Sequence, residues 1–252
     1  MKERFKLLNC NIENISLKEL LKQFNEGFII TPNVDHLITL QHDEEFYQIY
    51  QNADYIVADS QIIVNVLRFI LRKPLKEKIC GSDFFPAFCE HHKNNPEITV
   101  FLLGGRPGAP EKAREIINSR VGREIIIGAF APSMGFEKNE EECETIVEMI
   151  NDSKATVIAV GVGAPKQEKW LFKYKDKLKF AKIFMGIGVT IEFEAGLVKR
   201  SPKWVSRIGL EWLYRIMQEP ARLWKRYFLR DLPFFWLVFK QKFGRYKNPF
   251  ET

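Results

Sequence analysis

The chain changes from apolar to polar within a short stretch that begins at Thr156. Thr156-Val-Ile-Ala-Val160 is apolar and rich in β-branched residues, which is typical of a strand buried on both faces. Gly161-Val-Gly163 follows, and after Ala-Pro the chain continues with Lys166, Gln167 and Glu168. Because glycine lacks a Cβ atom, a ligand can approach the backbone closely there. The stretch therefore predicts a ligand-binding loop whose polar residues begin a helix.

Two earlier apolar runs also end in polar residues. Thr31-Pro-Asn33 follows one run, and Asp59-Ser60 follows the next. A polar residue at one such place is usually a helix cap, and a cap for a helix that begins near Ser60 is the alternative role of Asp59. Caps alone do not explain Asn, Asp and Gln at three separate strand ends. We interpret these residues as parts of a binding site.

A fourth loop has the composition of a phosphate site. Leu103-Gly-Gly-Arg-Pro-Gly108 leads into a predicted helix, and small residues before a helix N-terminus favour a bound anion. Gly104 and Gly105 are therefore predicted to approach phosphate. Neither standard phosphate motif is present, because Lys166 stands where GxGxxG has its third glycine and no Walker lysine pattern occurs. A tight turn remains the alternative for each glycine pair.

Strands and helices must alternate to position these loops. Apolar runs predict strands at 28–31, 55–58, 100–103, 124–127, 156–160 and 182–185, and helical patterns occupy 43–52, 61–72, 109–119, 139–151 and 165–177. This order predicts an α/β fold with a mostly parallel sheet and helices on both faces. Ligands of such sheets bind beyond the carboxyl ends of the strands, where all four loops fall.

The charge distribution divides the chain at about residue 199. Residues 199–252 contain 13 Lys and Arg against 4 Asp and Glu, while residues 1–198 contain 25 against 28. The last part also holds four of the five tryptophans. We predict a 1–198 core and a 199–252 helical appendage that contacts an anionic partner, either a membrane surface or nucleic acid.

Other signals favour a cytoplasmic protein without a metal. The four cysteines form no CxxC pair, no signal peptide is recognisable, and no apolar run is long enough to span a bilayer. His91 and His92 follow Cys89 but lack further ligands at zinc spacing, so we expect a surface helix end there. Asp83 is expected to be an N-cap, and Glu168 to orient its helix or to pair with a lysine.

Several motifs together resemble those of one enzyme family. The segments "TPNVDHL", "ADYIVADS", "KICGSDFF", "FLLGGRPG", "GVGAPKQEKW", "RSPKW" and "GLEWLYRIMQEPARLWKRY" occur in the order found in the TagA/WecG/CpsF glycosyltransferases, glycosyltransferase family 26. The resemblance covers about residues 5–230. It implies a Rossmann-like core and an inverting transfer of a sugar, such as N-acetylmannosamine, from a UDP-sugar to an undecaprenyl-diphosphate-linked saccharide. Such enzymes work in teichoic acid or surface polysaccharide synthesis.

The same resemblance implies a setting for the reaction. The enzyme is expected to be peripheral on the inner face of the cell membrane, to bind it through basic C-terminal helices, and to use no cofactor and no nucleic acid. Whether it works as a monomer or as a homo-oligomer stays open.

The resemblance also assigns roles to individual residues. Asp59 matches the general base, Thr31 and Asn33 match polar pocket residues, and Gln167 matches a residue near the nucleotide-sugar. The remaining expected substrate contacts are Ser60, Lys78, Gly104, Gly105, Gly161, Gly163, Lys166, Arg215 and Arg222, the two arginines being expected to reach the diphosphate. Two positions depart from the family pattern, because Ser60 replaces a usual glycine and Lys78 a usual arginine. Lysine keeps the charge but loses the forked contact to diphosphate.

The appendage has the pattern of an interfacial helix. Arg222, Arg226 and Arg230 share one helical face, and aromatic and aliphatic residues lie opposite. The apolar run 232–239 is too short to span a bilayer but can lie in its interface. A helix docked on the core with a solvated basic face is the alternative.

Two other functions compete with sugar transfer. A dinucleotide-dependent oxidoreductase would have the same fold class, although the glycine motif is incomplete and no ribose-binding acid is found at the expected place. An anionic-surface or RNA-binding protein without catalytic activity would explain the basic appendage but not the polar strand ends. Glu192 and Glu194 are expected on one face of a strand at a solvated edge, and His36 could lie near substrate through its place after Asn33.

Overall fold

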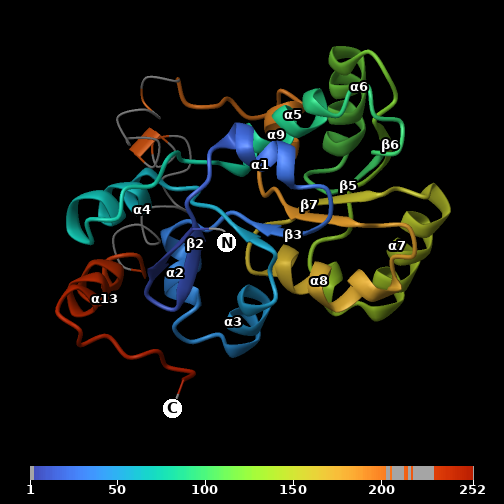
Figure 1. The fold of residues 1–252 in the computed structure, drawn as a ribbon. Coiled ribbons are helices and arrows are strands. Elements are labelled where there is room, and N and C mark those ends of the chain that lie inside the picture. Colours follow the sequence, from blue (N-terminus) through green and yellow to red (C-terminus); the bar gives the residue numbers. More distant parts are fainter. Residues whose placement is uncertain (1–2, 203–204, 206–212, 215–216, 218–229, 252) are drawn as a thin grey trace. The chain divides into compact units, whose positions relative to one another are not determined.

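The computed structural model describes residues 3–202, 205, 213–214, 217 and 230–251 (Figure 1). These residues form two compact units, each built from separate parts of the chain. The first unit contains Met1–Leu17, Thr31–Cys80 and Arg200–Thr252, and the second contains Lys18–Ile30 and Gly81–Lys199.

The second unit is built on parallel strands in the order β3 (Gly27–Ile30), β8 (Ile183–Gly186), β7 (Val157–Gly161), β5 (Val100–Gly104) and β6 (Ile126–Phe130). Every neighbouring pair in this series is parallel. All residues of β5 and β7 are buried, as expected of central strands covered on both faces. These five strands were predicted from the apolar runs, and their ends differ by at most three residues.

Helices cover both faces of this sheet (Figure 1). One face carries α1 (Leu17–Gln23), α5 (Gly81–His91), α6 (Ala109–Val121) and α9 (Thr190–Glu194), and the other carries α7 (Glu140–Ser153) and α8 (Lys166–Tyr174). Short 3₁₀ turns, Phe136–Lys138 and Lys175–Lys177, lie before α7 and after α8. The predicted α/β class with helices on both faces is thus confirmed. The short helices α1 and α9 were not predicted, whereas α5 corresponds to the helix expected between Asp83 and His91–His92.

The first unit begins with an antiparallel hairpin that the sequence analysis missed. Its strands are β1 (Arg4–Leu7) and β2 (Cys10–Glu13). The unit also contains α2 (Val34–Thr39), α3 (Glu44–Gln51), β4 (Tyr55–Ile56), α4 (Gln61–Asn65), a π-helix (Val66–Ile70) and α13 (Pro233–Lys242). The predicted strand at 55–58 and the helices at 43–52 and 61–72 correspond to β4, α3 and α4 with the π-helix.

The described C-terminal residues pack into the first unit. The Gln241 side chain accepts a hydrogen bond from Leu8 N (2.8 Å) and donates one to the Lys6 carbonyl (2.9 Å), so α13 is joined to the hairpin turn. Phe234 and Val238 on the same face of α13 are fully buried. The division into a 1–198 core and a 199–252 appendage stays a prediction, but residues 230–251 contribute to the core of this unit.

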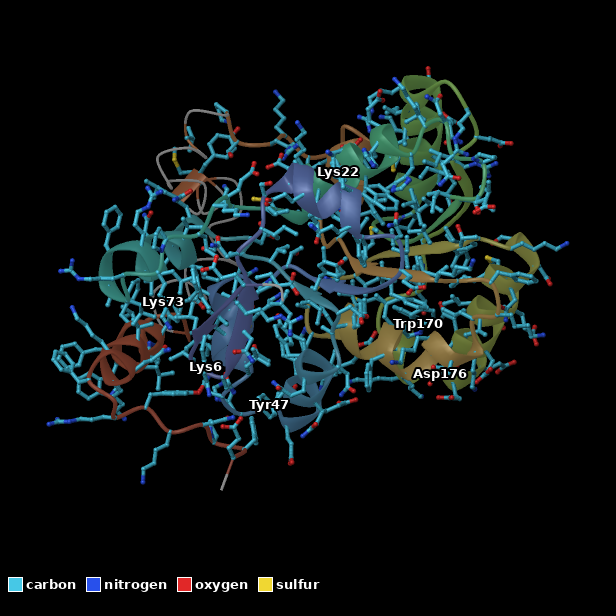
Figure 2. The ribbon with its side chains drawn as sticks, viewed as in Figure 1. Lys6, Lys22, Tyr47, Lys73, Trp170 and Asp176 are labelled. Atoms are coloured by element: carbon cyan, nitrogen blue, oxygen red, sulfur yellow. The ribbon has the colours of Figure 1, made fainter. Side chains whose placement is uncertain are left out.

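Tyr47 of α3, labelled in Figure 2, contacts the last described segment of the chain. Its ring stacks on Phe250 with centroids 5.2 Å apart, and its hydroxyl donates to Glu251 (3.0 Å). The segment after α13 is therefore held against α3 by both an aromatic and a polar contact.

Three local expectations were wrong. Glu192 and Glu194 lie in α9 rather than on a strand, and Glu194 forms an ion pair with Arg120 (2.7 Å). Asp83 lies inside the first turn of α5 and does not precede it. The helix ends at His91 and that residue is exposed as expected, but His92 is buried against the Phe88 ring, with centroids 4.5 Å apart, because it lies one helical turn after Phe88.

Candidate active site

Two glycine loops of the second unit meet at the carboxyl ends of β5 and β7. Gly104 ends β5, and Gly105 N donates to the Gly161 carbonyl (3.1 Å) at the end of β7. A Cβ atom at Gly104 would lie only 2.6 Å from the Gly161 oxygen, and the φ of Gly104 is +121°. Only glycine fits this conformation at this distance, so the residue type is required for the two loops to touch.

The loop after β5 leads directly into the N-terminus of α6. Gly108 precedes the helix in a left-handed conformation, and Pro110 lies in its first turn. The N–H groups of the first turn of a helix lack intrahelical partners and attract anions. This arrangement fits the predicted phosphate contact of Gly104 and Gly105, which stays a prediction.

Gln167 holds the loops that follow β7 and β8. Its side-chain oxygen accepts hydrogen bonds from Gly163 N and Gly188 N, both at 3.1 Å. The side chain is buried, with 4% of the residue exposed. Gln167 therefore supports the fold at this loop end, while its predicted contact with nucleotide-sugar stays a prediction.

Glu168 is the most unusual titratable residue of this region. It is 1% exposed, its Oε1 accepts a hydrogen bond from Gln167 Nε2 (2.7 Å), and its Oε2 has no hydrogen-bond partner among the described residues. Burial raises the pKa of this carboxyl to about 7, and the Gln167 hydrogen bond only partly offsets that effect. The side chain that hydrogen-bonds to Glu168 is thus the neighbouring Gln167 amide and not a lysine, and sequence reasoning missed this contact.

The other residues at the start of α8 have structural partners. Lys166 is exposed and pairs with Glu137 (2.6 Å). Burial alone would raise the pKa of Glu137, but the hydrogen bond and charge of Lys166 lower it overall. Trp170, labelled in Figure 2, is buried and donates its indole N–H to Cys143 Sγ (3.3 Å). α8 is therefore anchored along its length.

In the first unit, three chain segments are joined around Asp59. Asp59 N donates to the Pro32 carbonyl (2.9 Å), which places Asp59 beside Thr31 and Asn33. Ile79 N donates to the Ala58 carbonyl (2.9 Å), which brings the residue after Lys78 to the same place. The structure thus brings together five predicted site residues that are up to 47 positions apart in sequence: Thr31, Asn33, Asp59, Ser60 and Lys78. All five are partly exposed, so a ligand can reach them.

Two of these residues also begin helices. The Asn33 side chain accepts from His36 N (3.2 Å) at the start of α2, and the Ser60 hydroxyl accepts from Ile62 N (3.2 Å) at the start of α4. The N-cap of α4 is thus Ser60. The alternative that Asp59 serves as this cap is wrong, and its predicted role as general base stays a prediction.

Comparison with known proteins identifies the family. The profile of the glycosyl transferase WecG/TagA/CpsF family matches residues 5–248. The chain belongs to this family. It is also 30% identical, over 89% of its length and 84% of the relative's, to a Staphylococcus aureus protein named N-acetylglucosaminyldiphosphoundecaprenol N-acetyl-beta-D-mannosaminyltransferase. The protein is therefore a glycosyltransferase, and the oxidoreductase and RNA-binding alternatives receive no support.

The structure adds an ion pair at α2 of this transferase that sequence reasoning missed. Arg230 Nε lies 2.9 Å from Asp35, and Arg230 Nη2 donates to Thr39 (3.0 Å). The arginine joins the C-terminal segment to the helix that Asn33 caps. His36, in the same helix, is buried and shares a 2.7 Å hydrogen bond with the Tyr50 hydroxyl. Arg215, Arg222 and Arg226 lie outside the described residues.

Proposed function

We propose that this glycosyltransferase moves N-acetylmannosamine, or a related hexose derivative, from a UDP-sugar to an undecaprenyl-diphosphate-linked saccharide with inversion. The observation that carries the proposal is the convergence of Asp59 with Thr31, Asn33 and Lys78 in a partly exposed place. The name of the Staphylococcus aureus relative supports the sugar and the lipid-linked acceptor. Synthesis of teichoic acid or another surface polysaccharide is the corresponding process.

Asp59 is proposed to act as the general base. An inverting transfer is a single displacement, in which an acceptor hydroxyl attacks the anomeric carbon as the bond to UDP breaks. The hydroxyl proton passes to the Asp59 carboxylate, and the negative charge leaves with the diphosphate. Thr31 and Asn33 are proposed to orient sugar hydroxyls beside it, Ser60 to add a hydroxyl contact, and Lys78 to stabilise the diphosphate charge.

The loops of the second unit are proposed to bind the nucleotide-sugar. Their close contact through Gly104 and Gly161 is proposed to let the diphosphate approach the helix start of α6. Gly105 and Gly163 shape the two loops, and Lys166 and Gln167 supply a charge and an amide at the start of α8. Arg215 and Arg222 are proposed to complete the diphosphate site.

A direct assay tests this proposal. The enzyme is mixed with a lipid-diphosphate-linked N-acetylglucosamine acceptor or a soluble analogue, and UDP release is measured with several UDP-sugars. We expect release that depends on both donor and acceptor, with UDP-N-acetylmannosamine preferred. Binding of NAD or RNA without any acceptor-dependent UDP release would contradict the proposal and favour one of the two rejected classes.

A membrane-binding surface is proposed on α13. Its inner face is buried, but Leu232, Phe235, Trp236, Phe239 and Phe243 share the opposite face and are each 47–58% exposed. Trp236 and Phe239 stack with centroids 5.7 Å apart. A contiguous exposed aromatic surface of this kind is typical of a membrane or protein contact. We refer to these five residues as the aromatic face of α13.

Positive charge beside the aromatic face favours an anionic bilayer as its partner. Lys240 lies over the Trp236 ring at 5.5 Å, and Lys242, Arg245 and Lys247 follow within a few residues. Aromatic rings and lysines together suit the headgroup region of a membrane. None of the described helices is long and apolar enough to cross a bilayer. We therefore propose peripheral binding at the inner face of the cell membrane.

The double variant Trp236→Ala/Phe239→Ala is expected to weaken binding to phosphatidylglycerol-containing vesicles by about tenfold or more, because each aromatic side chain contributes about 1.5–3 kcal/mol when fully buried. The double variant Lys240→Gln/Lys242→Gln should weaken vesicle binding by about 1 kcal/mol per charge removed. Added salt should reduce the difference in binding between this variant and the unaltered chain. Vesicle co-sedimentation across a salt series measures both effects.

The matched control for the aromatic face is Phe180→Ala. Phe180 is also exposed, at 44%, but lies in the second unit. The Phe180→Ala variant should bind anionic vesicles as tightly as the unaltered chain does. If the unaltered chain does not bind anionic vesicles at low salt, or if the control loses as much binding as the double variant, the membrane proposal for this face is wrong.

A further inference from the structure

The hydrogen bonds of the Gln167 amide fix which of its groups remain available. Its oxygen has two lone pairs, and these already accept from Gly163 N and Gly188 N. Its nitrogen has two N–H groups, and one donates to Glu168 Oε1. Among the residues that the structure describes, the second N–H has no partner. A ligand at this amide therefore meets a hydrogen-bond donor and no acceptor.

The amide cannot be reversed without losing all three contacts. In the opposite orientation, its NH₂ group would face two backbone N–H donors, and its oxygen would face the Glu168 carboxylate. Glu168 thus contributes to the orientation by accepting from the nitrogen. The pair is also confined sterically, because a Cβ atom at Gly186 would lie 2.5 Å from Gln167 Nε2 and 2.8 Å from Glu168 Oε1.

The environment of Glu168 is unfavourable for a carboxylate, and this cost calls for a reason why a glutamate stands at this position. The carboxyl is buried, one of its oxygens has no hydrogen-bond partner among the described residues, and its other oxygen accepts from a neutral amide. A buried carboxylate without a cation destabilises a fold. A residue that destabilises the fold and orients a loop amide is typical of a functional site.

We propose that Glu168 is a positioning residue, which holds the Gln167 amide so that its remaining N–H donates to an acceptor oxygen of the bound nucleotide-sugar. The acceptor is a sugar hydroxyl oxygen, an N-acetyl carbonyl or a phosphate oxygen, since each of these has a free lone pair. This inference rests on the proposed function for the identity of the ligand. The arrangement of the pair itself rests on the contacts alone.

An exchange of the two side chains separates structure from binding. In the double variant Gln167→Glu/Glu168→Gln, the residue 167 carboxylate can still accept from both glycine N–H groups and can accept from the new amide at 168. The internal contacts are thereby rebuilt with donor and acceptor exchanged, but no N–H remains at 167 for the ligand. Gln167→Glu alone places two buried carboxyls together, which cannot both ionise without large cost.

The variants are compared at pH 8 by thermal unfolding and by calorimetric titration with UDP-N-acetylmannosamine and UDP. Gln167→Glu is expected to lower Tm by about 10 °C, and the exchanged pair to recover at least half of that loss. The exchanged pair should still bind the UDP-sugar about tenfold or more weakly, because one ligand hydrogen bond is missing. Lys173→Gln, on the exposed side of α8, is the matched control and should change neither value.

The proposal is overturned if the exchanged pair recovers Tm and binds the UDP-sugar as tightly as the unaltered enzyme, or if it folds with a Tm no higher than that of Gln167→Glu. A measurement on the unaltered enzyme covers the case in which the exchanged pair does not fold. With ¹⁵N-labelled glutamine side chains, saturation with UDP-N-acetylmannosamine should shift one Gln167 N–H proton signal more than the other. Two unmoved signals would contradict the proposal. Failure of the proposed function is distinct, because the unaltered enzyme would then bind no UDP-sugar at all.

Discussion

Asp59→Asn is expected to lower the rate of sugar transfer by about 10²–10⁴-fold, the usual contribution of a general base. The asparagine has nearly the same shape, and Asp59 N keeps its hydrogen bond to the Pro32 carbonyl. Ser60, and not Asp59, caps α4, so the substitution leaves the start of that helix unchanged. The fold and the affinity for UDP should therefore persist while turnover falls.

UDP release under saturating donor and acceptor measures the loss, and thermal unfolding with calorimetric UDP titration tests the fold and the nucleotide affinity. Asp43→Asn is a matched control in the same unit. Asp43 caps α3 by accepting from Phe46 N (3.0 Å), and asparagine can make the same contact. Near-normal turnover in Asp59→Asn would place the base elsewhere.

Glu168→Gln is expected to raise the free energy of unfolding at pH 8 by about 3 kcal/mol. Burial raises the pKa of the Glu168 carboxyl from the ordinary 4.5 to about 7, and each pKa unit corresponds to about 1.4 kcal/mol. The folded protein holds the neutral carboxyl more tightly than the unfolded chain does. The stability of the unaltered enzyme relative to the variant is thus highest below pH 4.5. It falls as the pH rises from 4.5 to 7 and changes little above pH 7. The rise in Tm at pH 8 should be about 10 °C.

The difference in unfolding free energy between the two proteins, measured from pH 4.5 to pH 8, isolates this residue. Other groups act in the same range, since burial and the neighbouring charges of His91 and Arg123 lower the pKa of His92 to about 4, which favours folding as the pH rises. Glu137→Gln is a control with no pH dependence in this range, because the pKa of Glu137 is lowered and its contribution to stability is lost only as the pH falls below 4.5. A pH-independent difference for Glu168→Gln would show that the carboxyl is not desolvated.

The parts of the fold that could be predicted are those with strong local patterns. The buried strands β5 and β7 are continuous apolar runs, and Gly104 and Gly161 stand directly at their ends. Parallel strands place their carboxyl ends at one edge, which is why residues far apart in sequence could be grouped before any contact was known. The motif order then gave the enzyme class.

The missed features are a helix that is too short to give a clear pattern and contacts between residues that are distant in sequence. The helix α2 has only six residues, and its start becomes recognisable only once Asn33 is seen to accept from His36 N. The isolation of Glu168 follows from burial beneath the β8 end, which no pattern around "PKQEKW" reveals. The contacts of Gln241 with the hairpin turn join residues more than 230 positions apart. The residue type of Asn33 could have indicated a helix N-cap, but no residue near Gln241 in the sequence indicates its contact with the hairpin turn.

The first unit is assembled from three parts of the chain, and this has a consequence for synthesis in the cell. Residues 1–17 and 31–80 leave the ribosome well before their partners in 200–252, among them Gln241 for the hairpin and Arg230 for α2. Domains generally fold as units during translation, while the ribosome adds about 5–20 residues per second. This unit can therefore close only after residues 200–252 have been synthesised, whereas most of the second unit is continuous and can fold earlier. The aromatic face of α13 emerges together with Arg230 and Gln241, so the proposed membrane contact becomes possible only when the hairpin and α2 can also bind their C-terminal partners.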